Sequence, residues 1–252
     1  MSIATKGYGR SAWHHARRGV ERVVYAYKLR IRREERTALA SYPRSGNTWL
    51  RRLLEEATGQ TCGTIYEAET ILPAPDAGLA IKTHMRDAYR YSRAIHLVRH
   101  PLDVLDSYYC WKRDCAGGKD MEWERFINKR SAAWVRHTRY WMGVSCDVFR
   151  LRYEDLVADP FGRLQALIRW LGLEISDEGI RAAVEACSFE SLKKEGVSRG
   201  QPQFFRRGTV GDSLGNYTEE QLSMLSARFA PLLEEWGYDV SLQPEGSVQP
   251  SP

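Results

Sequence analysis

A short apolar run leads into a Pro-Arg-Ser-Gly turn and then into a helical pattern, and this junction limits the fold more than any other feature. Residues 38–42 predict a strand, and apolar residues recur on one helix face from Trp49 until Gly59 ends the pattern. Backbone amides, two hydroxyl groups and the positive end of a helix dipole can converge there on one anion. The sequence therefore indicates a P-loop-like strand, loop and helix.

The loop itself differs from the loop that binds nucleoside triphosphates. The pattern GxxxxGK[ST] is absent, and Arg44 precedes Gly46, whereas the lysine of that pattern follows its glycine. A kinase or ATPase therefore loses its main support. The loop alone fits equally well an ordinary Pro-Gly turn capped by Ser45 or Thr48, so the rest of the chain has to distinguish these two possibilities.

Strand and helix patterns alternate along the remainder of the 252 residues. This alternation predicts a single α/β domain with a mostly parallel central sheet flanked by helices, and it places ligands beyond the carboxyl ends of the strands. The further predicted strands are 79–83, 94–99 and 147–151, and the further predicted helices are 101–113, 122–141, 160–172, 176–187 and one from Thr218 to about Trp236.

Composition divides the chain into three parts. Residues 1–36 predict a basic N-terminal helical extension, residues 37–240 the domain, and residues 241–252 a disordered tail. We expect the extension to pack on the domain, with a membrane-surface or partner helix as the alternative. The net charge of +5, from 37 basic and 32 acidic residues, suits an anionic ligand but not nucleic acid.

Cysteine usage and hydropathy bear on the compartment. The five cysteines form no CxxC pair and no zinc-like spacing, which argues against disulfides and a structural metal and indicates a reducing compartment. No apolar run approaches the length of a transmembrane helix or forms a signal-peptide core. We therefore expect a soluble, cytoplasmic protein that needs no metal.

A second block ends a predicted strand at Arg99, and Ser107 follows eight residues later. Arg99 can clamp a phosphate with two hydrogen bonds, and Ser107 can add a hydroxyl donor. An arginine ion pair and a helix-facing serine are the structural alternative. This block and the loop Tyr42–Trp49, YPRSGNTW, resemble the 3′-phosphate motif and the 5′-phosphosulfate loop, YPKSGTTW, of cytosolic-type sulfotransferases that use 3′-phosphoadenosine 5′-phosphosulfate (PAPS).

Three further blocks follow the order of that family. They are Lys82-Thr83-His84, similar to its KTH element, Tyr153-Glu154-Asp155-Leu156, similar to its YED element, and Phe205-Arg206-Arg207-Gly208 with Gly211-Asp212, similar to its RKG…GD loop. Because the five blocks are ordered and span residues 42–212, a chance resemblance is not expected.

The resemblance implies the PAPS sulfotransferase fold and transfer of the sulfuryl group to an acceptor hydroxyl, with release of adenosine 3′,5′-bisphosphate. It implies His84 as the general base, a role that imidazole suits near neutral pH. Lys82 and Arg44 are the cations that would stabilise the leaving group. The implied donor-binding residues are Arg44, Ser45, Gly46, Asn47 and Thr48 for the 5′ end, Trp49 and Tyr153 for the adenine, and Arg99, Ser107, Phe205, Arg206, Arg207 and Gly208 for the 3′-phosphate.

Three departures from the family pattern matter. Arg44 replaces the usual lysine, and because guanidinium stays protonated we expect it to stabilise charge without donating a proton. Cys187 stands where the family often has a threonine near the adenine, so its role there is in doubt. The tryptophan of the usual GDW is missing after Asp212, and the family's dimerisation stretch is not matched at 214–224, so the oligomeric state stays open.

Two other functions remain as alternatives. The strand-loop-helix geometry alone fits a nucleotide kinase or NTPase, and the basic extension fits a catalytically silent nucleotide-binding adaptor. The acceptor stays open among phenols, aliphatic alcohols, sugars and amines. Loops 60–78, 110–121 and 190–205 are expected to shape its pocket, with the aromatic residues Tyr66, Trp111, Phe204 and Phe205.

Overall fold

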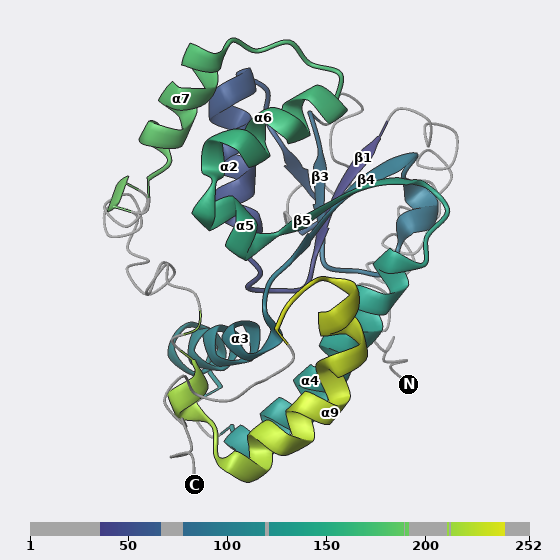
Figure 1. The fold of residues 1–252 in the computed structure, drawn as a ribbon, viewed down its shortest axis with the longest axis vertical. Coiled ribbons are helices and arrows are strands. Elements are labelled where there is room, and N and C mark those ends of the chain that lie inside the picture. The colour runs from purple at the N-terminus through teal and green to yellow at the C-terminus, as the bar shows by residue number, and fades with distance from the viewer. Residues whose placement is uncertain are drawn as a thin grey trace, which may run out of the picture.

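A parallel sheet forms the centre of the molecule (Figure 1). The computed structural model describes residues 36–66, 78–118, 121–188, 190–191, 211 and 213–239. Within these residues the sheet has five strands in the order β2-β3-β1-β4-β5, and every neighbouring pair is parallel. The strands are β1 (Thr37–Ser41), β2 (Gly63–Thr64), β3 (Ile81–Thr83), β4 (Arg93–Val98) and β5 (Asp147–Arg152).

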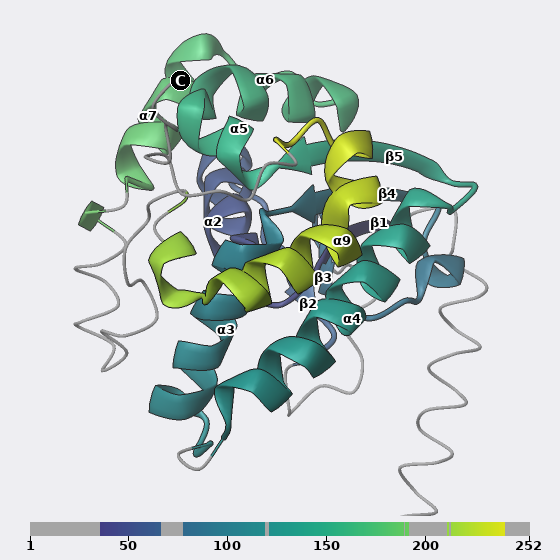
Figure 2. The same cartoon turned by 60° about the horizontal axis from the view of Figure 1, so that its bottom comes forward.

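Helices cover both faces of this sheet. The described helices are α2 (Asn47–Thr58), α3 (Pro101–Cys115), α4 (Trp123–Met142), α5 (Tyr153–Ala158), α6 (Pro160–Trp170), α7 (Asp177–Ala186) and α9 (Glu219–Glu235), with 3₁₀ turns η2 (Ala88–Arg90) and η3 (Leu214–Asn216). Figure 2 shows α2, α5, α6 and α7 on one side of the sheet and α4 and α9 on the other. The predicted α/β fold class, a mostly parallel sheet flanked by helices, is confirmed.

Alternate residues of the strands belong to two different cores. Leu39 and Ile95 pack with apolar residues of α2, α6 and α7. Ala38 and Ala94 point to the opposite face, where they pack with Trp141 of α4. This period of two follows from the pleat, and both faces are apolar because helices cover a parallel sheet on each side. The small alanines leave room for the Trp141 ring against the sheet.

Local signals at the helix ends agree with the observed bounds. Gly59 follows α2 with a φ of 65°, a left-handed conformation that glycine adopts readily, and its N–H donates to the Glu55 carbonyl. Thr218 precedes α9 and forms a capping box with Gln221. Both of these helix ends were predicted from the sequence.

Two elements were missed, and one strand is shorter than predicted. The strand predicted at 79–83 comprises only Ile81–Thr83. β2 has two residues, too few for an alternating pattern, and lies within the loop predicted at 60–78. α5 begins directly after β5, so no turn residue marks its start. The predicted extension 1–36, except for Arg36, and the predicted tail 241–252 lie outside the described residues.

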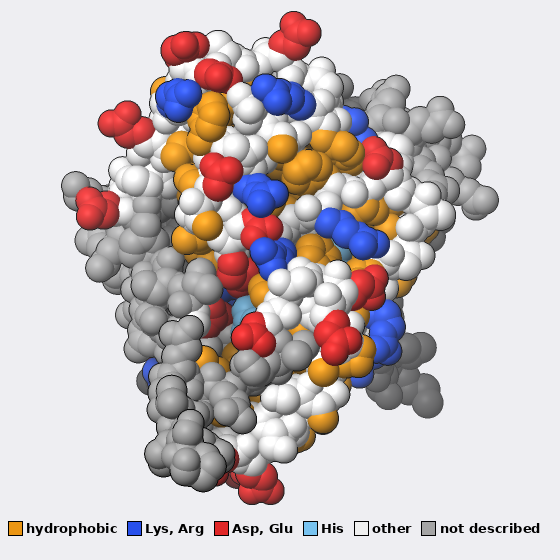
Figure 3. Space-filling view, viewed as in Figure 1, with side chains coloured by type: hydrophobic (Ala, Val, Ile, Leu, Met, Phe, Trp, Pro, Cys, Tyr) orange, Lys and Arg blue, Asp and Glu red, His pale blue; other side chains and the backbone are white. Residues whose placement is uncertain are grey.

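The face drawn in Figure 3 carries charges of both signs. Basic and acidic side chains lie interspersed on this face. No described helix combines the length and the apolar character needed to cross a bilayer.

Two buried histidines lie in the core between the sheet and α4. His96 of β4 is 0% exposed and His137 of α4 is 4% exposed, and their ring centroids are 6.2 Å apart. No ring nitrogen of either residue has a hydrogen-bond partner among the described residues. Burial lowers the pKa of both side chains, that of His137 to about 3. Both imidazoles are therefore neutral in the folded protein at neutral pH.

This pair predicts acid-sensitive stability. The pKa of each histidine is lower in the folded than in the unfolded state, so below about pH 6.5 the unfolded state binds more protons. The free energy of unfolding therefore falls as the pH drops below about 6.5. Between pH 7 and 5.5 each histidine should remove about 1 kcal/mol from the free energy of unfolding. At lower pH the raised pKa values of Asp87 and Glu154 act in the opposite direction.

Denaturant unfolding at several pH values checks this prediction. His137→Phe should flatten the decline between pH 7 and 5.5, whereas Lys129→Ala, an exposed change on the same helix, should leave the slope unchanged. The comparison uses the slope, because the substitution also alters packing. Equal slopes in the wild type and His137→Phe would contradict the prediction.

Candidate active site

Three of the sequence blocks begin at the same edge of the sheet. β1 pairs in parallel with β3 on one side and with β4 on the other, where Ser41 lies opposite Leu97. The loop after Ser41, His84 after β3 and Arg99 after β4 therefore leave neighbouring strands at their carboxyl ends. This edge is where ligands bind in open α/β sheets.

The loop after β1 leads into the N-terminus of α2 without a capping side chain. Arg44 and Gly46 have φ values of 72° and 92°, and both lie in the left-handed region. No side chain caps α2, and its first turn has no acidic residue. Ser45 is 0% exposed, and its hydroxyl has no hydrogen-bond partner among the described residues. A buried hydroxyl beside an uncapped helix N-terminus suits an anion.

The next two residues of the loop differ in how they face this site. Asn47 is buried, and its amide donates to the Leu39 carbonyl at 3.2 Å and to the Ser41 hydroxyl at 3.0 Å. Its side chain therefore ties α2 to β1, which leaves the backbone N–H as the group that can meet a ligand. Thr48 lies in the first turn of α2 and is partly exposed.

Arg44 connects the loop to the block that follows β4, and Arg99 begins that block. Arg44 Nε donates to Ser107 Oγ at 3.1 Å, so the loop meets α3 directly. The Arg99 guanidinium lies 4.5 Å from the centre of the Tyr153 ring and 3.6 Å from the Asp103 carboxylate. The structure thus brings together the residues predicted to bind the two ends of the donor.

Tyr153 and Trp49 lie between the loop after β1 and the block after β4. Their rings meet edge to face with centroids 5.8 Å apart, and the Tyr153 ring also lies against Gly46. The Trp49 indole N–H donates to the Cys187 carbonyl at 3.0 Å. Cys187, whose role was in doubt from its side chain, therefore orients Trp49 through its backbone. A sequence pattern cannot signal such a backbone contact.

His84 is held in one orientation at the end of β3. Its Nδ1 lies 2.7 Å from the Ser41 carbonyl, and because a carbonyl only accepts, Nδ1 carries the proton and Nε2 keeps its lone pair. The Tyr66 hydroxyl accepts from the His84 backbone N–H at 2.8 Å, and the two rings stack. Burial, and then the charge of Lys82, lowers the pKa of His84 to about 4. The imidazole is therefore a neutral base at pH 7.

Lys82 lies in β3 between β1 and β2, opposite Leu39 and Thr64. Its positive charge is the second cause, after burial, of the lowered pKa of His84. Of the predicted site residues, only Phe205, Arg206, Arg207 and Gly208 lie outside the described part of the chain. The sequence analysis missed the roles of Ser41 and Asp103. Asp103 lies within the second block, four residues after Arg99, which was the available signal.

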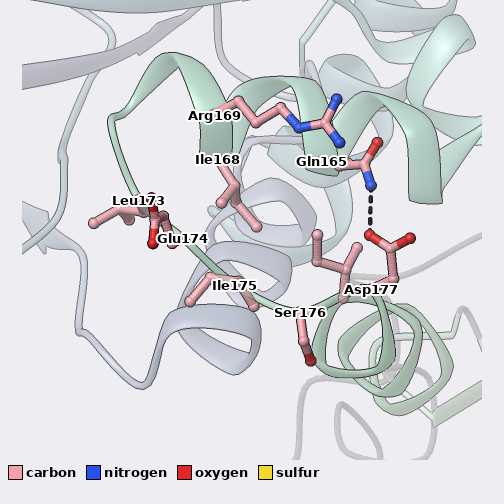
Figure 4. A pocket seen from close by; sticks show the side chains of 9 residues that line it. Gln165, Ile168, Arg169, Leu173, Glu174, Ile175, Ser176 and Asp177 are labelled. Carbon is pink, nitrogen blue, oxygen red and sulfur yellow. Dashed lines mark hydrogen bonds between the residues drawn. The ribbon is translucent and has the colours of Figure 1, made fainter.

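Other candidate sites are weaker among the described residues. No group of three His, Cys, Asp or Glu side chains there could hold a metal. A hollow of about 500 Å³ lies between α6 and α7, where Gln165 donates to Asp177 (Figure 4). Arg93, the first residue of β4, donates to carbonyls at the C-terminal end of α6. That part of α6 is therefore near the amino ends of the strands, at the opposite edge from His84.

The fold and this strand-edge site define an α/β protein with a P-loop-like junction that lacks the triphosphate pattern. The model of the sulfotransferase domain matches residues 79–237, more than half of the chain. The chain therefore belongs to the sulfotransferase domain family.

The chain is also similar to individual proteins of known sequence or structure. WSCD family member AAEL009094 of Aedes aegypti is 28% identical over 217 residues, which cover 77% of this chain and 66% of that protein. Sulfotransferase 1A1 of Bos taurus is 24% identical over 240 residues, 76% of this chain and 81% of that protein. The crystal structure of mouse sulfotransferase SULT7A1 complexed with PAP has a TM-score of 0.68 at 22% identity, covering 80% of this chain and 85% of that one. The chain spans less than two thirds of the WSCD relatives.

Proposed function

We propose that this protein transfers the sulfuryl group of PAPS to an acceptor hydroxyl and releases adenosine 3′,5′-bisphosphate. The observation that carries the proposal is the contact between Arg44 and Ser107, 3.1 Å apart, which joins the 5′-phosphosulfate loop to the 3′-phosphate block. The orphaned hydroxyl of Ser45 and the uncapped N-terminus of α2 fit the 5′ end of such a donor. Arg99 and Ser107 fit the 3′-phosphate, and Trp49 and Tyr153 offer rings for the adenine. Arg206, Arg207, Gly208 and Phe205 stay proposed members of the 3′ site.

In the proposed mechanism, His84 Nε2 removes the proton of the acceptor hydroxyl. The acceptor oxygen then forms a bond to sulfur, and the bond between sulfur and the bridging oxygen of the 5′-phosphate breaks. The leaving phosphate keeps the electron pair, and Arg44 and Lys82 stabilise its charge. Arg44 acts only as a cation, because guanidinium does not give up its proton near neutral pH. No metal is needed for this chemistry.

The proposed acceptor is a small molecule or a carbohydrate. Tyr66 and Met85, which flank His84, are 48% and 50% exposed, and Tyr89 of η2 is 62% exposed. These apolar surfaces would contact the body of an acceptor whose hydroxyl faces His84. Trp111, also predicted to shape the pocket, is partly buried against the core that includes Tyr108.

The full chain with labelled PAPS and a panel of phenols, aliphatic alcohols, sugars and amines tests this function. We expect label to move to at least one acceptor class, and adenosine 3′,5′-bisphosphate to bind without magnesium. A nucleotide kinase or NTPase would instead bind ATP with magnesium and hydrolyse or transfer its phosphate. A silent adaptor would bind the bisphosphate without any turnover. Failure to bind the bisphosphate would contradict the proposal.

A further inference from the structure

One buried carboxylate joins its own helix to two other segments beside the proposed 3′-phosphate site. Asp103 lies in the first turn of α3, and its side chain is 3% exposed. One of its oxygens accepts from the Ser213 hydroxyl at 2.6 Å. The other accepts from the Gly211 backbone N–H at 3.0 Å and lies 3.6 Å from Arg99 Nη2. Asp103 thus connects α3, the end of β4 and the segment that leads into α9.

Tyr153 and Asp103 confine the Arg99 side chain. Its Cζ lies over the Tyr153 ring, 4.5 Å from the ring centre, and its Nη2 lies 3.6 Å from the Asp103 carboxylate. The Arg99 side chain is only 14% exposed, so few other orientations are open to it. A guanidinium that binds phosphate with two parallel hydrogen bonds has to hold its plane, and a buried carboxylate can fix that plane.

The segment after Gly211 is attached to α3 at more than one point. The Tyr217 hydroxyl donates to the Leu102 carbonyl at 2.7 Å, and Asn216 donates to Asp106 at 3.0 Å. The contacts of Gly211 and Ser213 with Asp103 precede these two attachments in the sequence. In sequence, Gly211 lies three positions after Gly208, which ends the block Phe205-Arg206-Arg207-Gly208 proposed to bind the 3′-phosphate.

We propose that Asp103 is a positioning residue for recognition of the donor's 3′-phosphate, acting through Arg99 and through the chain at Gly211. The inference rests on the proposed function. Removal of the charge would leave Arg99 without its carboxylate and the Gly211 N–H and Ser213 hydroxyl without a charged acceptor. The consequence should be specific to ligands that carry a 3′-phosphate.

A purely structural role would give a different result. A carboxylate that only stabilises the fold would affect all nucleotides alike through the folded fraction. Recognition of the 3′-phosphate is therefore measured as a ratio, namely the affinity for adenosine 3′,5′-bisphosphate divided by the affinity for adenosine 5′-monophosphate. These two ligands differ only in the phosphate in question.

Titration calorimetry of the full chain with both nucleotides tests the inference. Asp103→Asn keeps the shape of the side chain but replaces the carboxylate that faces the Gly211 N–H and Arg99 with a neutral amide. We expect the affinity ratio to fall roughly 10- to 100-fold, with the monophosphate affinity nearly unchanged. Asp106→Asn, which alters a carboxylate on the same helix that contacts the same segment, should keep the wild-type ratio.

Ser213→Ala provides a second variant that retains the Asp103 charge. It removes the 2.6 Å hydrogen bond and should lower the ratio in the same direction by a smaller factor. This variant keeps the inference testable if Asp103→Asn does not fold. A wild-type ratio in a folded Asp103→Asn or Ser213→Ala protein would overturn the inference and leave the proposed function intact. A wild type that does not distinguish the two nucleotides would overturn both.

Discussion

Replacement of His84 by alanine should lower kcat by a factor of about 10² to 10⁴, the usual contribution of a general base. The Ser41 carbonyl holds the Nδ1 proton of His84, so Nε2 is the only ring nitrogen that can accept one. The affinity for adenosine 3′,5′-bisphosphate should stay near the wild-type value, because His84 is not among the residues proposed to bind the nucleotide. Initial rates and calorimetry measure the two quantities separately.

The pH dependence of the wild type gives a second readout of His84. A base with a pKa of about 4 stays unprotonated at pH 5.5, so kcat/KM should be flat from pH 7.5 to 5.5 while the protein is folded. An unperturbed histidine would lose about tenfold over this interval. His100→Gln serves as the control. His100 also lies near the strand ends, but its ring packs on Tyr238, so this substitution should leave kcat unchanged. A kcat within threefold of the wild type in His84→Ala would contradict the proposed base.

Replacement of Gly46 by alanine should lower the affinity for the donor roughly 100-fold. An added Cβ would lie 2.3 Å from Tyr153 Cδ2, far inside van der Waals contact. The ring of Tyr153 would have to move, and with it the contacts that this ring makes with Arg99 and Trp49. Calorimetry with adenosine 3′,5′-bisphosphate measures the loss.

The same helix provides a matched control for this substitution. Gly59, after the C-terminal end of α2, also has a positive φ, but an added Cβ there meets nothing within 4 Å. Backbone strain should lower the free energy of unfolding of both Gly46→Ala and Gly59→Ala by about 1 kcal/mol, and the collision with Tyr153 should lower that of Gly46→Ala further. Only Gly46→Ala should weaken donor binding. Equal affinities of the two variants would show that the space at Gly46 has no role in the site.

Local patterns were sufficient to predict most of the sheet and the long helices. The alternation of strand and helix patterns predicted the parallel sheet, and Gly59 and Thr218 marked helix ends because glycine and threonine act there through their own backbone and side chain. The strand-edge position of His84 and Arg99 followed from parallel strand order. β2 escaped because a two-residue strand contains no period.

The finer features of the site depend on contacts between distant residues. The hydrogen bond from Trp49 to Cys187 joins residues that are 138 positions apart and uses a carbonyl, which every residue has. The contacts of Asp103 with Gly211 and Ser213 also require α3 and the segment before α9 to be adjacent in space. A single sequence contains no local signal for such pairs, whereas the ordered sulfotransferase blocks identified the residues that surround them.

The left-handed backbone of Arg44 has a consequence for the stability of the protein. With arginine at a φ of 72°, the folded protein is less stable than it would be with glycine at this position by roughly 1 kcal/mol, because the Cβ crowds the following carbonyl. A chain optimised only for thermal endurance would have glycine or asparagine at this position. The arginine therefore represents a compromise in which the molecule gives up some resistance to heat to keep a permanent positive charge beside Ser107.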